Sequence, residues 1–277
     1  MHLFLRYETP NRSSPDTAAS SGRLSACNET HRATATWVQG EALVGGGEIL
    51  SDRLKQNRDT LLAEIAAACG RVSRDPATVK LIAVTKYAEI DWVRDLVALG
   101  QTTLGENRPQ QLVERAGLLP GATWHLIGHL QRNKVRAVLP HVACIHSIDS
   151  LKLLARIGEI AGELGLTPEV LLEVNVSGEA SKDGFTPDTV RAEWTALRSV
   201  PNVRLAGLMT MAPLADDPES ARPTFRRLHA LRDELQSAGG PRLPELSMGM
   251  SGDFSIAIEE GATMVRIGSR LFEGLEA

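Results

Sequence analysis

An apolar run, VKLIAVTK at residues 79–86, begins the regular part of the fold and ends in Lys86. Val, Leu and Ile with little alternation are typical of a strand that is buried on both faces. A lysine at the carboxyl end of such a strand lies near apolar surface, which lowers the pKa of its ammonium and favours the neutral amine that attacks carbonyl groups. Taken alone, a lysine at a strand end more often extends to water. Lys86 is therefore a candidate only in combination with other residues.

Strand-like and helix-like segments alternate from this run to the end of the chain. The candidate strands are 79–86, 102–106, 123–128, 142–148, 169–176, 203–211, 245–250 and 263–268, and the candidate helices between them are 90–99, 107–118, 131–139, 150–165, 187–199, 218–238 and 253–260. Eight strands that alternate with helices are typical of an α/β fold of one kind, the (β/α)8 TIM barrel. A doubly wound open sheet permits the same alternation. Because no strand resembles an edge strand, we predict a single closed barrel.

A segment of different character precedes the barrel. Residues 1–46 are rich in Ser, Thr, Ala, Asn and Gly and lack periodicity, so we expect a disordered or non-native N-terminal extension without a function of its own. Residues 47–277 then form the barrel domain. Its first element is predicted to be an extra N-terminal helix, because apolar residues from Ile49 to Val72 recur at helical spacing.

Composition excludes several classes of function. The 277 residues are 43% hydrophobic and 23% charged, with a net charge of −4 and no basic block, which argues against nucleic acid as a partner. No apolar stretch approaches the length of a membrane span. Cys27, Cys69 and Cys144 are widely separated, and this pattern indicates free thiols in a reducing compartment. We therefore expect a cytoplasmic protein that contacts neither nucleic acid nor membrane.

Polar side chains gather at the predicted carboxyl ends of the strands, where a barrel of this kind carries its ligand site. After the seventh strand, Ser251 and its neighbours precede a helix, so their backbone N–H groups could attract a phosphate. Gly268 and Ser269 follow the eighth strand, and phosphate sites in these barrels commonly use the loops after strands seven and eight. The alternative is that Ser251 only caps a helix and Gly268 only ends a strand. Their joint position favours phosphate.

Arg266 lies near the end of the eighth strand, where an unpaired guanidinium is costly to bury. Its partner could be a structural carboxylate or a ligand atom. A Schiff-base lysine, a phosphate cradle and an arginine together indicate pyridoxal 5′-phosphate, with the aldehyde on Lys86, the phosphate on Ser251 and Ser269, and Arg266 facing the pyridine nitrogen. An arginine there does not keep that nitrogen protonated, so the ring is a weaker electron sink than beside a carboxylate.

Eight segments carry a resemblance to the pyridoxal-phosphate homeostasis protein family, also described as YggS-like or PROSC-like. In chain order they are VTK (84–86), GEN (105–107), WHLIGHLQRNK (124–134), HSIDS (146–150), EVN (173–175), GLMTM (207–211), LSMGMS (246–251) and GATMVRIG (261–268). The resemblance runs from about residue 48 to the end. It departs from the family pattern in residues 1–46 and at Gly252, where an acidic residue or alanine is expected.

The resemblance implies a fold like the N-terminal barrel of alanine racemase, without the second domain of that enzyme. It implies that Lys86 carries pyridoxal phosphate as a Schiff base, that Ser251, Gly268 and Ser269 hold the phosphate and that Arg266 faces the pyridine nitrogen. The other residues that it places around the pocket are Asn107, His129, Asn175, Met209 and Ser247. It further implies a protein that buffers or supplies the cofactor, with apo forms of pyridoxal-phosphate enzymes as recipients and a monomeric or weakly dimeric state.

Three functions remain open at this point. The first is a carrier with little or no catalysis. Racemisation needs a second acid/base, and neither tyrosine of this chain is expected to supply it, because Tyr7 lies in the N-terminal segment and Tyr87 follows Lys86 directly. The second is a slow racemase or related amino-acid enzyme that uses His129 or His125 as that base. The third is a Schiff-base aldolase without a cofactor. A metal enzyme is not expected, since the histidines come without a nearby carboxylate cluster.

Overall fold

The structure, a computed structural model, describes residues 46–179 and 183–275. The expectation for the N-terminal extension concerns residues 1–45, which lie outside the described residues. The first described element is the helix α1 (Gly46–Arg71), which begins three residues before the apolar spacing that predicted it. The extra N-terminal helix is therefore present.

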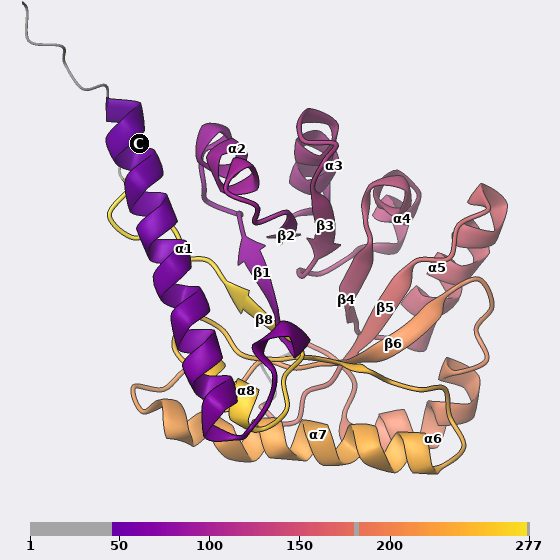
Figure 1. The fold of residues 1–277 in the computed structure, drawn as a ribbon. Coiled ribbons are helices and arrows are strands. Elements are labelled where there is room, and N and C mark those ends of the chain that lie inside the picture. The colour runs from indigo at the N-terminus through magenta and orange to yellow at the C-terminus, as the bar shows by residue number, and fades with distance from the viewer. Residues whose placement is uncertain (1–45, 180–182, 276–277) are drawn as a thin grey trace, which may run out of the picture. The chain divides into compact units, whose positions relative to one another are not determined.

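Eight parallel strands form a closed barrel, and each pairs with its neighbours in chain order (Figure 1). They are β1 (Lys80–Val84), β2 (Thr103–Glu106), β3 (Thr123–Leu126), β4 (Cys144–Ile148), β5 (Glu169–Glu173), β6 (Arg204–Met209), β7 (Glu245–Ser247) and β8 (Met264–Ile267). The pairing of β8 with β1, in which Ala83 lies opposite Ile267, closes the circle. All eight strands lie within the predicted ranges, and the open doubly wound sheet was the wrong alternative.

Helices follow the strands as predicted, with two exceptions. They are α2 (Ile90–Ala98), α3 (Pro109–Leu118), α4 (Val135–Val138), α5 (Leu151–Leu164), α6 (Pro187–Leu197), α7 (Arg222–Ser237) and α8 (Phe254–Glu259). The first exception is that the helix expected over 218–238 begins as a 3₁₀ turn at Pro218–Ala221, and the α-helix starts only at Arg222. The second is that the single helix expected over 131–139 is instead three short pieces, in which 3₁₀ turns at Arg132–Lys134 and Leu139–His141 flank α4. Pro140 lies in the latter turn, and proline has no N–H with which to continue an α-helix.

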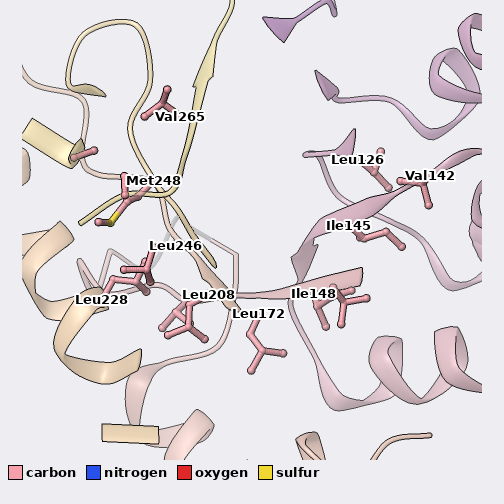
Figure 2. Packing of buried hydrophobic residues seen from close by; sticks show 14 of the residues in the cluster. Leu126, Val142, Ile145, Ile148, Leu172, Leu208, Leu228, Leu246, Met248 and Val265 are labelled. Atoms are coloured by element: carbon pink, nitrogen blue, oxygen red, sulfur yellow. The ribbon is translucent and has the colours of Figure 1, made fainter. Parts of the chain in front are cut away.

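Both faces of the barrel strands are buried, the outer face against the helices and the inner face inside the barrel. Side chains that point outward pack with the helices in one large apolar cluster, part of which is drawn in Figure 2, including Ile145, Leu172, Leu208 and Leu246. A smaller cluster fills the barrel interior and consists of Ile82, Cys144, Leu171, Ala206, Met209 and Met264. In β8, Met264 belongs to the inner cluster and Val265 and Ile267 to the outer one, so the alternation of the strand directs Arg266 inward.

The N-terminal helix is attached near the seam where the chain closes. Asn57 of α1 donates to the carbonyls of Leu271 and Glu273, and Glu64 accepts from Arg270. Leu61 and other apolar residues of α1 join the outer cluster. The helix therefore stabilises the C-terminal segment that follows β8, and with it the loop that carries Ser269.

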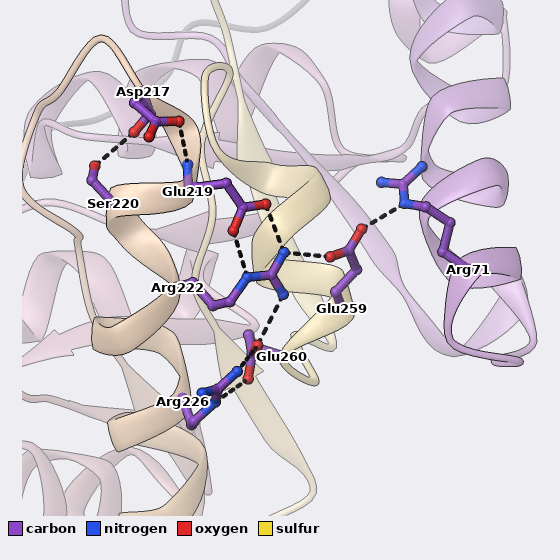
Figure 3. Close-up of polar contacts among 8 residues, drawn as sticks. All are labelled: Arg71, Asp217, Glu219, Ser220, Arg222, Arg226, Glu259 and Glu260. Atoms are coloured by element: carbon purple, nitrogen blue, oxygen red, sulfur yellow. Dashed lines mark hydrogen bonds and ion pairs between the residues drawn. The ribbon is translucent and has the colours of Figure 1, made fainter.

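A charge cluster joins α1, α7 and α8 (Figure 3). Arg222, at the start of α7, pairs with Glu219, Glu259 and Glu260, and Glu259 also pairs with Arg71. Although burial opposes it, the hydrogen bonds from Arg222 and Arg71 hold the pKa of Glu259 below its usual range. Because Glu259 ends α8, the cluster fixes the short helix that follows the loop after β7.

The described residues contain no helix that is both long and apolar enough to cross a membrane. Cys69 and Cys144 are buried thiols without a disulfide, and Cys27 lies outside the part of the chain that the structure describes. The expectation of free thiols therefore holds for the two cysteines that can be seen.

Candidate functional site

Three neighbouring loops carry the predicted lysine and the predicted phosphate residues. Lys86 follows β1, Ser269 follows β8 and Ser251 follows β7, and these three strands are adjacent in the barrel. Their carboxyl ends meet at the same mouth, because all strands run parallel. Barrel closure thus brings together residues that are far apart in the sequence.

The sequence predicted Lys86 as the last residue of the first strand. In the structure it lies in the turn that follows that strand. The strand β1 ends at Val84, and the turn closes with a hydrogen bond from the Ala88 N–H to the Thr85 carbonyl. Arg115 of α3 donates to the carbonyls of Thr85 and Ala88, at 2.7 Å each, and these two groups flank the lysine. The Thr85 N–H still donates to the Gly105 carbonyl of β2, so the guanidinium binds the chain at the point where it leaves the strand.

A buried carboxylate supports this turn from below. Glu106, the last residue of β2, is fully buried. Its Oε2 accepts from the Thr85 hydroxyl at 3.1 Å and lies 3.6 Å from Nη1 of Arg115, while its Oε1 accepts from the Asn107 N–H at 2.8 Å. Glu106 and Arg115 therefore neutralise each other's charge beneath the lysine.

The Lys86 side chain itself is held loosely. It is half-buried, its Nζ lies 5.0 Å from the centre of the Tyr87 ring, and it makes no hydrogen bond to any described residue. It borders a cavity of about 360 Å³ that is also lined by Gln111 and Leu118 of α3. Tyr87 is 79% exposed. The amine can therefore turn about the four-carbon stem, while its backbone is fixed by Arg115.

The two predicted phosphate loops touch each other. The Ser269 hydroxyl donates to the Ser251 hydroxyl at 2.9 Å. Within the described residues, the backbone N–H groups of Ser251, Gly252, Ser269 and Arg270 have no hydrogen-bond partner. A Cβ on Gly268 would lie 3.1 Å from the Val84 carbonyl oxygen, so glycine lets the loop after β8 pass close to the end of β1. Hydroxyls and unused N–H groups on adjacent loops form a set of donors that suits an anion.

The position of Ser251 differs in one respect from the prediction. The helix α8 begins at Phe254 and has only six residues, with Asp253 before it. Asp253 accepts from the Met250 N–H at 2.6 Å and so closes the turn that contains Ser251. Ser251 therefore donates from a tight turn before the helix and does not lie at the helix terminus itself.

Arg266 is 5% exposed and crosses the barrel interior toward β6 and β7. Its Nη1 donates to the Ser247 hydroxyl at 2.6 Å and its Nη2 to the Thr210 carbonyl at 3.0 Å. Burial lowers the pKa of Arg266 to about 10, against the opposing charges of Asp253 and Glu173. No carboxylate of the described residues lies within ion-pair distance, so the alternative of a structural ion pair was wrong.

Ser247 contacts the first of two buried histidines that are hydrogen-bonded to each other. The Ser247 hydroxyl lies 2.8 Å from Nδ1 of His146, and Nε2 of His146 lies 2.8 Å from Nδ1 of His125. Cys144 is close to both rings, since one donor atom from each of the three residues lies within 4.8 Å of the others. The sequence did not predict that these histidines meet, because strands β3 and β4 had to be placed in register first.

The other predicted pocket residues have varied surroundings. Met209 is part of the inner apolar cluster. Asn107 is exposed and packs against Gly128, where a Cβ would lie 2.1 Å from the Asn107 carbonyl oxygen. His129 is exposed and pairs with Asp149 at 3.1 Å.

Asn175 organises the loop after β5. Its Oδ1 accepts from the N–H of Gly178, and its Nδ2 donates to the Glu179 carbonyl at 2.8 Å. The half-buried side chain is thus committed to local contacts, although it follows a strand end as predicted.

Glu173 is a titratable residue at this mouth that the sequence did not single out. It ends β5 and is 8% exposed. Burial raises the pKa of its carboxyl to about 7, although the charge of Arg266 acts in the opposite direction. Its place at the end of a strand, two residues before Asn175, was the available signal. Glu173 can therefore change its protonation state near neutral pH.

Comparisons with known proteins agree with this geometry. A family model for the N-terminal domain of alanine racemase matches residues 57–275. The pyridoxal phosphate homeostasis protein of Aquifex aeolicus is 42% identical over 214 residues, which cover 76% of this chain and 94% of the relative. That of Bos taurus is 39% identical over 230 residues, covering 75% of this chain and 82% of the relative.

Solved structures give the same result. PipY of Synechococcus elongatus, with pyridoxal phosphate bound, has a TM-score of 0.69 and 37% identity, covering 80% of this chain and 99% of PipY. Alanine racemase of Clostridium difficile has a TM-score of 0.64 at 19% identity, covering 82% of this chain and 58% of the enzyme, and shares the fold. The chain described here belongs to the pyridoxal phosphate homeostasis protein family, built on the barrel of the alanine racemase N-terminal domain.

Proposed function

We propose that this protein binds pyridoxal phosphate reversibly through Lys86 and buffers or supplies it, with little or no catalysis. The observation that carries the proposal is the state of Arg266. A guanidinium buried in a barrel interior is normally paired with a carboxylate, whereas this one donates to a hydroxyl and a carbonyl. Two of the five N–H groups of an arginine are thus used, and the others remain for a neutral ring nitrogen.

The residues at the mouth fit the three parts of the cofactor. The Ser251 and Ser269 hydroxyls and the unused N–H groups of their loops suit the phosphate. Arg266 suits the pyridine nitrogen, and Lys86 supplies the amine. Bound pyridoxal phosphate supplies an aldehyde that condenses with an amine. Asn107, His129, Asn175, Met209, Ser247 and Gly268 remain proposed as residues that line the pocket.

The same residues explain why catalysis would be weak. Proton transfer on both faces of a substrate needs two positioned acid/base groups. Tyr87 is turned to solvent, His129 is paired with Asp149, and His125 is bonded to His146 inside the barrel. None of the three is therefore a well-placed second base.

The test is an absorbance spectrum with borohydride trapping. Wild-type protein with pyridoxal phosphate should develop a visible band that borohydride converts into a covalent adduct, and Lys86→Ala should lose both. Lys152→Ala is the matched control, because Lys152 is an exposed lysine at the start of α5, on the same side of the barrel. A wild-type protein that stays colourless would refute the proposal and favour the aldolase alternative. Equal trapping by Lys86→Ala would refute the anchor.

Glu173 favours one second candidate, a slow racemase or related amino-acid enzyme. A carboxyl with a pKa of about 7 can accept and donate a proton near neutral pH. Exchange of the Cα proton of alanine in deuterated buffer, followed by NMR, tests this function. Exchange that is lost when either Lys86 or Glu173 is replaced would support the function as an amino-acid enzyme. Absence of exchange in the wild type would refute that function and leave the carrier function.

Partners, location and domain limits complete the proposal. We expect apo forms of pyridoxal-phosphate enzymes to be recipients, a monomeric or weakly dimeric state, and a cytoplasmic location. Light scattering across a range of protein concentrations tests the oligomeric state. A chain of residues 47–277 should bind pyridoxal phosphate with the affinity of the full chain if residues 1–46 are an extension without a function.

A further inference from the structure

Four buried side chains form a continuous hydrogen-bonded row across the barrel interior. They are Arg266 of β8, Ser247 of β7, His146 of β4 and His125 of β3, and none is more than 5% exposed. The successive contacts measure 2.6, 2.8 and 2.8 Å. We refer to these four residues as the relay.

The contacts of the described residues assign each hydrogen in the relay. A guanidinium can only donate, so one lone pair of the Ser247 oxygen accepts from Arg266. Among the described residues, the single acceptor within reach of the Ser247 hydrogen is Nδ1 of His146, so the hydroxyl donates to this nitrogen, which is then unprotonated. A neutral imidazole carries one N–H, so the hydrogen of His146 is on Nε2 and is donated to Nδ1 of His125. The His125 hydrogen is then on Nε2.

The surroundings keep both imidazoles neutral. Burial lowers the pKa of His146 well below its usual range, and the charges of His125, Arg266 and Lys80 act in the same direction. Burial also lowers the pKa of His125 to about 4, with the charge of Lys80 adding to it and Glu245 opposing it. A protonated His146 would leave the Ser247 hydrogen without an acceptor beside a buried cation.

A buried metal ion is the competing explanation for this cluster, because Cys144 adds a thiol to the two imidazoles. Both nitrogens of His146 are already engaged, one by Ser247 and one by His125. Burial raises the pKa of the Cys144 thiol far above its usual range, and a metal ligand must be a thiolate. The contacts therefore favour the relay.

We propose that His146, supported by His125, is a positioning residue for Arg266. By accepting the Ser247 hydrogen, His146 turns a lone pair of the hydroxyl toward Nη1 of Arg266. The Thr210 carbonyl fixes Nη2 at the same time, so the plane of the guanidinium is set before any ligand arrives. This role rests on the proposed function, because it presents the remaining N–H groups to the ring nitrogen of the cofactor.

The first test needs no cofactor. The full chain with ¹⁵N-labelled histidine should show a pyridine-type Nδ1 and a pyrrole-type Nε2 for both His146 and His125, assigned with His146→Gln and His125→Gln. A protonated Nδ1 in His146 would overturn the proposal, because the Ser247 hydrogen would then have no acceptor.

The second test compares three variants for pyridoxal-phosphate affinity and for the pH profile of the bound absorbance. His146→Leu removes the acceptor and should weaken binding by about 5- to 10-fold and shift the pH profile. His146→Gln keeps an acceptor and a donor and should stay within about 2-fold. Cys144→Ala, a neighbour in the same interior but outside the relay, should match wild type. Unfolding midpoints without cofactor control for the fold.

The outcomes separate this inference from the proposed function. Wild-type affinity and an unchanged pH profile in His146→Leu would overturn the positioning role while the proposed function stands. Equal impairment of the Gln and Leu variants would also overturn it, because the ring and not the acceptor would then matter. If wild type itself binds no pyridoxal phosphate, the proposed function fails and the positioning role fails with it.

Discussion

Replacing Arg115 by methionine tests how the turn around Lys86 is held. The change keeps most of the apolar stem but removes two hydrogen bonds of 2.7 Å, to the carbonyls of Thr85 and Ala88. It also leaves the fully buried Glu106 without a cation. Breaking a buried ion pair by removing one partner costs about 3–5 kcal/mol. We expect the free energy of unfolding to fall by that amount, a large share of the total stability of a domain.

Urea unfolding without cofactor measures this loss. Arg136→Met is the matched control, since Arg136 pairs with Glu163 on the surface and should change the free energy of unfolding by less than about 1 kcal/mol. Adding Glu106→Gln to Arg115→Met should restore about 1 kcal/mol or more, because the stranded charge is removed. A loss below about 1 kcal/mol in Arg115→Met, or no recovery in the double variant, would show that the pair does not hold the turn.

Three further predictions concern the phosphate loops, the mouth and the charge cluster. Replacing Ser251 and Ser269 together by alanine should weaken pyridoxal-phosphate binding by about 10-fold or more and leave binding of pyridoxal, which lacks the phosphate, unchanged in a spectroscopic titration. Because the pKa of Glu173 is raised to about 7, the wild type should lose stability as pH rises from about 4.5 to 7, where only the unfolded state has released the proton. Glu173→Gln should remove that slope in urea unfolding at several pH values, with a gain of at most about 3 kcal/mol at pH 8; parallel pH curves would contradict this. Arg222→Met should lower the thermal midpoint and reduce pyridoxal-phosphate affinity, because α8 loses the ion pairs of Glu259 and Glu260 with Arg222, whereas Arg191→Met on the surface of α6 should do neither.

Much of the barrel could be predicted because its signals are local. Each strand is an apolar run between turn residues, and all eight runs lie where the sequence placed them. The position of Lys86 could not be predicted in the same way. The strand ends at Val84, and the turn that follows is bound by Arg115 of α3, a contact that spans about thirty residues. Pro140 was a local sign that the helix predicted over 131–139 would be interrupted, but the helical spacing of the apolar residues was given more weight.

The contacts of the candidate site depend on the closure of the barrel. Ser251 and Ser269 were predicted to act together, and their hydroxyls do meet. The sequence left the partner of Arg266 open. Ser247 and Thr210 come within reach of its guanidinium only because the side chain points into the barrel and the strands pair in the observed register. His146 lies 101 residues from Ser247, so no spacing in the sequence indicates their contact. Side chains that meet across a barrel become visible only when the strands are placed.

The pairing of β8 with β1 has a consequence for synthesis. Lys86 follows the first strand, whereas Arg266 and Ser269 are translated only with and after β8, which follows the other seven strands and pairs with β1. A growing chain on the ribosome therefore has the amine but neither the phosphate loops nor the guanidinium. The three groups of the proposed site therefore come together only once β8 has been synthesised and has paired with β1. A chain interrupted before β8 would offer the cofactor the amine alone.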